Sequence, residues 1–170
     1  MASTIGLTDL FCNTTAPLIG LEIGVMDGSG SNALLSKLPT LTLHGIDPYI
    51  TYTDWCGTVF HDDSTTELIA KKKLEEYGDR FILHKKTSDD AISDFADNYF
   101  DFIFIDGLHT YEQVLKDCRN YYSKLKTGGV CAGHDYGPQI PAVVRAVDQF
   151  ALEVERTVTP FPTTSWYWIK

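Results

Sequence analysis

Residues 21–30 read LEIGVMDGSG and mark the point where an apolar strand turns sharply into a helix. The short apolar run at residues 18–24 predicts the strand, and residues 31–37 predict the helix. Glycine permits a tight turn and lets a ligand approach the backbone, while free amides at a helix start favour anionic groups such as a carboxylate. This stretch therefore predicts an α/β unit with a ligand site at its turn.

Two kinds of cofactor are bound by glycine loops with this spacing. Residues 28–33 satisfy the dinucleotide fingerprint GxGxxA, and residues 22–30 satisfy ExGxxxGxG, the wider pattern used for S-adenosylmethionine. A carboxylate at Asp27 would repel a pyrophosphate but would tolerate a sulfonium with an amino-acid tail. A plain strand-to-helix turn is the remaining alternative. The cofactor-binding candidates in this loop are Glu22, Gly24, Asp27, Gly28 and Gly30.

Strand and helix patterns alternate along the rest of the chain. Capping residues at Ser64 and Thr110 and the proline at Pro141 predict three further helix starts, and Gly128-Gly129 predict the end of the second of these helices. The alternation predicts one α/β domain over residues 1–170, with a mostly parallel, doubly wound sheet whose ligand lies beyond the carboxyl ends of the strands. The predicted strands are 18–24, 41–46, 80–84, 101–105 and 129–133, with two late strands near 153–158 and 164–169.

Polar residues follow the second and third predicted strands. Asp47 is placed to accept both ribose hydroxyls of an adenosine, and the neighbouring Pro48 to pack on its adenine. Ser88, after the third strand, is placed to meet the adenine edge. An ordinary turn at Asp47-Pro48 and a helix cap at Ser88 are the alternatives.

Acidic and imidazole groups follow the fourth and fifth predicted strands. Asp106 and His109 come after the fourth strand, and His134 and Asp135 after the fifth, so the four should converge beside the cofactor, which Asp106 is also expected to contact. Asp106 and Asp135 can hold a hard divalent cation such as Mg²⁺. Either histidine can take a proton from an acceptor hydroxyl, or simply brace a loop. The two aspartates together favour function, because clustered charges cost stability without a compensating role.

Through these motifs, the sequence resembles the class I S-adenosylmethionine-dependent methyltransferases. It is most similar to the branch of sugar, macrolide and other small-molecule O-methyltransferases, which includes macrocin O-methyltransferase-like and methyltransferase family 24-like proteins. The resemblance covers about residues 18–170. The segments that carry it are LEIGVMDGSG (21–30), GIDPY (45–49) and, most specifically, FIFIDGLHTYEQVLKD (102–117) and LKTGGVCAGHDY (125–136).

The resemblance implies a Rossmann-like sheet of seven strands in the order 3-2-1-4-5-7-6, with strand 7 antiparallel and paired in a final hairpin with strand 6. It implies S-adenosylmethionine as cofactor and a hydroxyl on a sugar or other small molecule as acceptor. It also implies a metal site at Asp106, His134 and Asp135. A histidine at position 134 departs from the usual acidic pair, so Mg²⁺, Mn²⁺ and metal-free base catalysis by His109 or His134 all stay open.

The connection Tyr49–Asp63 is long enough to form a wall or lid over the acceptor. Its residues Tyr52, Trp55 and His61 suit a sugar face or a flat ring, and suit ordinary loop packing nearly as well. Two rival functions remain. An NAD-dependent oxidoreductase would share GxGxxA and the acidic residue after the second strand, and a non-catalytic protein could retain the fold and bind the cofactor.

The composition of the chain limits the kinds of binding partner that are expected. The chain has 170 residues, a formal charge of −9 and a pI near 4.8, so neither nucleic acid nor membrane is expected as a partner. No apolar run approaches the ~20 residues that cross a bilayer, and no basic residue precedes Lys37. The four cysteines form no CxxC pair, which is typical of reduced thiols. We expect a cytoplasmic enzyme, with the aromatic residues 166–168 as core or as the interface of a homodimer.

Overall fold

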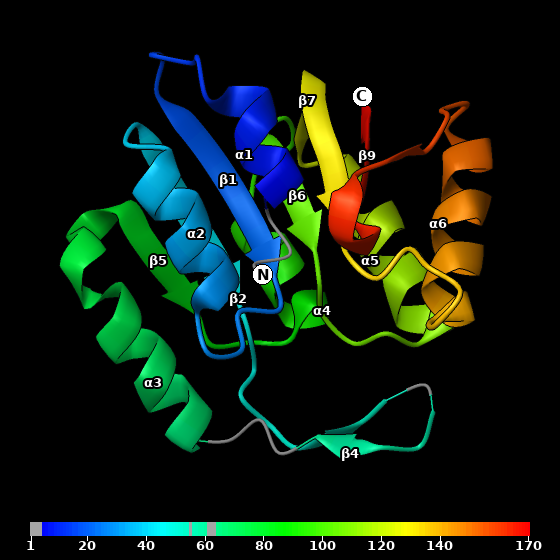
Figure 1. The fold of residues 1–170 in the computed structure, drawn as a ribbon, viewed down its shortest axis with the longest axis horizontal. Helices are drawn as coiled ribbons and strands as arrows, with labels where there is room; N and C mark the ends of the chain where they lie inside the picture. Colours follow the sequence, from blue (N-terminus) through cyan, green and yellow to red (C-terminus); the bar gives the residue numbers. More distant parts are fainter. Residues whose placement is uncertain (1–4, 55, 61–63) are drawn as a thin grey trace.

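The fold is built on one seven-stranded sheet covered by helices on both faces (Figure 1). The computed structural model describes residues 5–54, 56–60 and 64–170. Across the sheet the strands follow the order β5-β2-β1-β6-β7-β9-β8. Their bounds are β1 Leu18–Ile23, β2 Leu41–Ile46, β5 Phe81–His84, β6 Phe100–Ile105, β7 Leu125–Gly133, β8 Thr159–Pro160 and β9 Trp166–Ile169.

The sheet order confirms the doubly wound α/β fold. Numbered along the chain within this sheet, the strands run 3-2-1-4-5-7-6, and β9 is antiparallel to β7 while the first five strands are mutually parallel. One predicted strand lies later in the chain than expected. Residues 153–158, all of them described, contain no strand, because the last helix extends to Glu153 and β8 comes only at Thr159–Pro160.

Successive residues of β6 point to opposite faces of the sheet, so the helices divide into two layers. Phe104 packs in the same buried cluster as Leu34 of helix α2, and Ile105 packs in the other cluster with Val114 of helix α5. Helices α1 to α3 cover one face and α4 to α6 the other (Figure 1). Their bounds are α1 Ile5–Phe11, α2 Ser29–Lys37, α3 Ser64–Leu74, α4 Ser88–Ala91, α5 Tyr111–Tyr122 and α6 Pro141–Glu153, with 3-10 turns η1 Glu75–Arg80, η2 Ile92–Asp94 and η3 Pro162–Thr164.

Helix α5 is shorter than its apolar pattern predicted. It ends at Tyr122 rather than at Gly128-Gly129, because Leu125 already pairs with Phe100 and begins β7. The two glycines lie inside β7, beside the point where the register between β6 and β7 shifts. Sheet pairing therefore overrides the helical periodicity of residues 123–125.

A small hairpin follows the second strand of the sheet. Its strands β3 (Tyr52–Thr53) and β4 (Val59–Phe60) pair only with each other among the described residues. Figure 1 places the hairpin beyond the carboxyl ends of the parallel strands. It belongs to the segment predicted to wall the acceptor site, although Trp55 and His61 lie outside the described residues.

The aromatic end of the chain belongs to the core. Trp166 and Trp168 are buried and their rings stack with centroids 4.9 Å apart. They pack under α5 and α6 beside Phe150. As for membranes, no helix in the described part of the chain combines the length and the apolar character needed to cross one.

Candidate functional site

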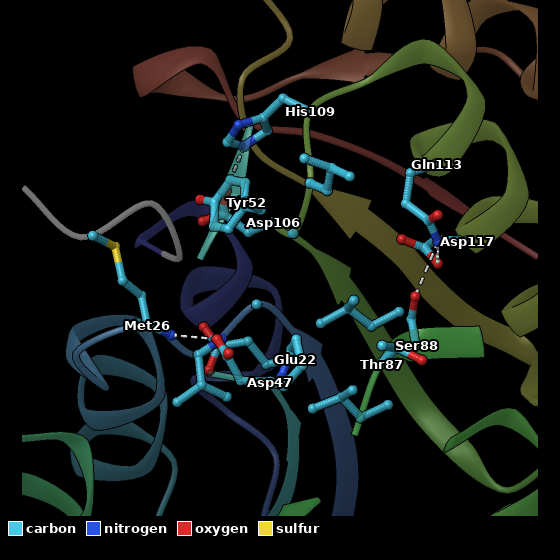
Figure 2. A pocket seen from close by; sticks show the side chains of 18 of the residues that line it. Glu22, Met26, Asp47, Tyr52, Thr87, Ser88, Asp106, His109, Gln113 and Asp117 are labelled. Carbon is cyan, nitrogen blue, oxygen red and sulfur yellow. Dashed lines mark hydrogen bonds and ion pairs between the residues drawn. The ribbon is translucent and has the colours of Figure 1, made fainter. Parts of the chain in front are cut away.

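A cavity of about 510 Å³ opens at the carboxyl ends of β1, β2 and β6. Its volume is in the range of small-molecule sites. Figure 2 shows Tyr52, Asp106 and His109 grouped at one end of it. Gly28 and Asp135 were predicted to be functional but lie just outside the lining. The predicted residues that do line the cavity are Glu22, Gly24, Asp27, Gly30, Asp47, Pro48, Ser88, Asp106, His109 and His134.

Glu22, near the end of β1, places a buried carboxyl group in the cavity wall. It is 2% exposed and accepts a hydrogen bond from the hydroxyl of Ser31 in α2. Burial raises the pKa of Glu22 to about 8, against the opposing effect of that hydrogen bond, and the charges of Asp106 and Asp47 add to the rise. A cation in the cavity would favour the ionised carboxylate. The wall is therefore suited to an ammonium or sulfonium group.

Asp47 holds the glycine loop in place. Its Oδ2 accepts the amides of Val25 at 3.0 Å and Met26 at 2.8 Å, and its Oδ1 accepts the amide of Tyr49 at 2.8 Å. Two of these residues, Met26 and Tyr49, have φ near +50°, a conformation that non-glycine residues adopt only when held. A carboxylate has about four lone-pair positions, so ribose binding by Asp47 stays a prediction beside this structural role.

Asp27 is paired with a cation that the sequence did not reveal. The ammonium of Lys73, in α3, lies 2.7 Å from Asp27 Oδ2, and Ser29 donates its amide and its hydroxyl to the same carboxylate. Partial burial would raise the pKa of Asp27, but Lys73 and Ser29 outweigh it and lower the pKa. The repulsion that Asp27 was expected to exert on a pyrophosphate is therefore weakened by Lys73.

Gly24 allows the ends of β1 and β6 to approach closely. Its φ is +94°, and a Cβ placed on it would lie 2.1 Å from the carbonyl oxygen of Asp106. No other residue type fits there without moving the backbone. Gly28 likewise has a positive φ, +77°, at the start of α2. The two glycines thus shape the strand-to-helix turn, as their positions predicted.

Three polar residues line the side of the cavity next to α4 (Figure 2). Gln113 Nε2 donates to Ser88 Oγ at 3.1 Å and to Asp117 Oδ1 at 3.0 Å. Asp117 is 1% exposed, and burial raises its pKa to about 6. The helix start at Thr110 is confirmed, but the Gln113 side chain turns to the cavity instead of closing a capping box. Sequence reasoning missed Gln113 and Asp117; a carboxylate on the apolar face of α5, three residues after Val114, was the available signal.

The four catalytic candidates meet at the other end of the cavity. Asp106, His134 and Asp135 each offer one ligand atom within 4.8 Å of the others. His134 Nδ1 lies 3.2 Å from Asp135 Oδ1 and 3.9 Å from Asp106 Oδ1. Burial would raise the pKa of Asp135, but His109 and His134 outweigh it and hold the pKa well below its usual range. Two carboxylates and an imidazole form a donor set that suits a divalent cation such as Mn²⁺.

His109 stands among three carboxylates. Its Nε2 lies 2.9 Å from Asp135 Oδ2 and 3.6 Å from Asp106 Oδ1, and its Nδ1 lies 3.2 Å from Asp54 Oδ2. Burial alone would lower the pKa of His109, but these carboxylates raise it to about 10. Nε2 is buried without a hydrogen bond of good geometry. Asp54 belongs to the β3–β4 hairpin and was not among the predicted site residues.

A family model described as a methyltransferase domain matches residues 21–136, the part of the chain that forms most of this site. An uncharacterized protein of Acanthamoeba polyphaga mimivirus is 27% identical over 141 residues, which are 79% of this chain and 60% of that protein. The chain therefore spans about 60% of the length of this curated relative.

Solved structures share the fold at low sequence identity. An O-methyltransferase from Bacillus cereus in complex with SAH has a TM-score of 0.71 at 16% identity, covering 97% of this chain and 79% of that one. A putative O-methyltransferase from Klebsiella pneumoniae has a TM-score of 0.69 at 18% identity, covering 100% and 81%. A putative caffeoyl-CoA O-methyltransferase from Staphylococcus aureus has a TM-score of 0.67 at 16% identity, covering 96% and 81%.

Proposed function

Because this chain belongs to the methyltransferase-domain family whose model matches residues 21–136, we propose that it transfers the methyl group of S-adenosylmethionine to a hydroxyl of a small molecule. The observation that carries this proposal is a single cavity that joins the glycine loop to the Asp106, His109 and His134 cluster. A cofactor on the loop and an acceptor at the cluster would lie side by side. The B. cereus O-methyltransferase, whose structure contains SAH, supports the cofactor assignment.

The cavity wall fits the chemistry of S-adenosylmethionine. The buried carboxyl group of Glu22 lines the cavity together with Gly24 and Gly30 of the glycine loop. When bound, the cofactor supplies an electrophilic methyl carbon on a positively charged sulfur. Ser88, Gln113 and Asp117 offer hydrogen-bonding groups to a polar ring at the far side of the cavity.

The acceptor that fits best is neutral. The cavity-lining residues, all within the described ranges, include Asp and Glu side chains and two histidines but neither lysine nor arginine. Phosphate and carboxylate groups are normally recognised by such cations. A coenzyme A thioester, with several phosphates, therefore fits poorly, although the S. aureus neighbour is described as a caffeoyl-CoA enzyme. A sugar or another neutral polyol has hydroxyl groups that can donate hydrogen bonds to these carboxylates.

The side chains at the cluster can carry out the transfer as follows. Asp106 and Asp135 orient the acceptor hydroxyl, the protonated ring of His109 holds Asp135 in place, and the Asp106 carboxylate takes the hydroxyl proton. The acceptor oxygen then forms a bond to the methyl carbon while the carbon–sulfur bond breaks and its electron pair stays on sulfur. Alignment of oxygen, carbon and sulfur can lower the barrier by roughly 7 to 11 kcal/mol.

We propose that Asp106, His134 and Asp135 hold a divalent cation, with Mn²⁺ favoured over Mg²⁺ by the imidazole. The cation would supply positive charge that favours the ionised form of the acceptor hydroxyl. The protein's own contribution is to keep the two carboxylates and the His134 ring within reach of one point.

The direct test measures cofactor binding first and transfer second. Calorimetric titration with S-adenosylhomocysteine should give saturable binding, and titration with NAD should give none. Isotope-labelled methyl transfer is then measured to neutral sugars and polyols, with coenzyme A thioesters as the contrasting acceptor class. NAD binding without S-adenosylhomocysteine binding would contradict the proposal, and cofactor binding without transfer to any hydroxyl would favour a non-catalytic binding protein.

A further inference from the structure

We propose that Tyr52, on the β3–β4 hairpin, determines the acceptor class by packing its ring against the face of a pyranose, the six-membered ring of a sugar. The proposal rests on the proposed transfer reaction and deepens it, because it narrows a neutral hydroxyl acceptor to a cyclic sugar. It also makes the hairpin part of the acceptor site rather than a cover over the cavity.

Tyr52 supplies an aromatic ring to the cavity wall. Within the described ranges, it is the only phenylalanine, tyrosine or tryptophan that lines the cavity. Figure 2 shows it grouped with Asp106 and His109, at the end where we place the acceptor. Ser88 and Gln113, where the polar ring of the cofactor is expected, lie at the other side. The aromatic ring is therefore placed for the acceptor rather than for the cofactor.

The alternation of side chains along the hairpin segment directs Tyr52 toward the cavity. Side chains two residues apart point to the same side of an extended strand. Ile50 and Tyr52 both line the cavity, and Asp54 continues the series as a buried side chain. Thr51 and Thr53, which alternate with them, are exposed. Tyr52 therefore lies on the side of the hairpin that faces the sheet.

A buried contact holds this side of the hairpin against the sheet. Asp54 Oδ2 lies 3.2 Å from His109 Nδ1, and the two side chains are 5% and 19% exposed. The amide of Asp54 donates to the carbonyl of Thr58 at 2.9 Å, within the hairpin. Because Asp54 is two residues from Tyr52, these contacts fix the aromatic ring beside the cluster before any acceptor binds. A wall formed in advance lowers the entropic cost of binding.

The two kinds of surface at this end of the cavity match the two kinds of surface on a sugar ring. The carboxylates of Asp106 and Asp135 can accept hydrogen bonds from hydroxyls on the ring edge. The carbon-bound hydrogens on the ring face form an apolar surface that an aromatic side chain such as Tyr52 can cover. A phenol has a flat face but few hydroxyls, and an acyclic polyol has hydroxyls but no fixed face. A pyranose uses both surfaces.

Saturation-transfer NMR tests the packing without requiring methyl transfer. The probes are methyl pyranosides of the gluco, galacto and manno configurations, added to protein loaded with S-adenosylhomocysteine. Sorbitol, an acyclic polyol, and catechol, a flat aromatic diol, are the contrasting probes. We expect saturation to be strongest at the carbon-bound hydrogens on one face of a pyranoside. Tyr52→Ala should weaken binding of that pyranoside about tenfold, and Tyr52→Phe should retain it.

Tyr77→Ala is the matched control. Tyr77 lies outside the cavity lining, where its hydroxyl donates to Asn32, so this variant should bind the pyranoside like wild type. Binding of S-adenosylhomocysteine to Tyr52→Ala should stay close to wild type, which shows that the variant is folded and that Tyr52 does not hold the cofactor. With an acceptor that is methylated, Tyr52→Ala should raise KM about tenfold and leave kcat nearly unchanged, because it removes binding that ground state and transition state share.

Four results would overturn the proposal. They are the absence of pyranoside binding to the wild-type protein, equal pyranoside binding by Tyr52→Ala, a loss in Tyr52→Ala of catechol binding alone, and a loss there of S-adenosylhomocysteine binding alone. Failure of the proposed function is recognised separately. If a pyranoside binds through Tyr52 but receives no methyl group, the transfer reaction fails while the assignment of Tyr52 holds. If S-adenosylhomocysteine does not bind, the cofactor assignment fails, and the pyranoside comparison is made on the free protein.

Discussion

The carboxylate of Asp47, directly after β2, accepts the backbone amide of Met26, in the loop after β1, at 2.8 Å (Figure 2). The bond joins two neighbouring strand ends at the base of the cavity. With the amides of Val25 and Tyr49 also bound, this one side chain determines the conformation of the loop that is expected to hold the cofactor. Asp47 is therefore a structural residue of the site whether or not it also contacts a ribose.

Asp47→Ala should lower the free energy of unfolding by about 3 kcal/mol, because it leaves buried amides without an acceptor and releases the strained Met26 and Tyr49. Urea denaturation measures the change. Asp9→Asn on the exposed face of α1 should change stability by less than about 0.5 kcal/mol. An Asp47→Ala protein as stable as wild type would show that water replaces the carboxylate.

Gly24→Ala should destabilise the protein far more than Gly128→Ala. Both glycines have positive φ, +94° and +80°, but a Cβ at Gly24 meets the Asp106 backbone at 2.1 Å while a Cβ at Gly128 meets nothing within 4 Å. Backbone strain alone costs about 1 to 2 kcal/mol. The difference between the two variants in thermal or urea unfolding isolates the clash, and equal losses would mean that β1 and β6 can separate freely.

The stability contributed by Glu22 should fall as the pH rises. Its pKa is about 8 in the folded protein against 4.5 for an ordinary glutamate, so the folded state binds the extra proton between these values. Stability is then lost progressively from pH 4.5 to 8, on the order of 4 to 5 kcal/mol in all. Glu22→Gln should match wild type near pH 4.5 and exceed it at pH 9 in urea denaturation. Parallel stability curves for the two proteins would contradict the raised pKa.

Mn²⁺ should bind at the Asp106, His134 and Asp135 cluster. Electron paramagnetic resonance of the free ion measures binding, and Asp135→Asn should weaken it at least tenfold. At 100 times its dissociation constant, Mn²⁺ should raise the free energy of unfolding by about 2.7 kcal/mol, and chelation should reverse the gain. Asp9→Asn should bind like wild type. Equal binding by Asp135→Asn would place the ion elsewhere.

Most of the fold could be predicted because its signals are local. Strand β2 was predicted with its observed bounds, and the alternation with helices then requires parallel strands whose carboxyl ends meet. From that rule, the proximity of four residues could be predicted without knowledge of their contacts: Asp106, His109, His134 and Asp135. The two boundary errors, at the end of α5 and at β8, arose where pairing with distant strands outweighed local periodicity.

By itself, therefore, the sequence determined the α/β class and the edge at which the polar residues gather, while the order of the sheet was implied by the resemblance to a known family. Only the tertiary structure decided how those residues are paired. Lys73 reaches Asp27 across 46 positions, and Asp54 reaches His109 across 55. Local sequence preferences do not encode such pairs, because the pairs depend on where a helix and a hairpin pack against the sheet. The periodicity of a strand shows which face a side chain is on, whereas its charge partner is set by packing.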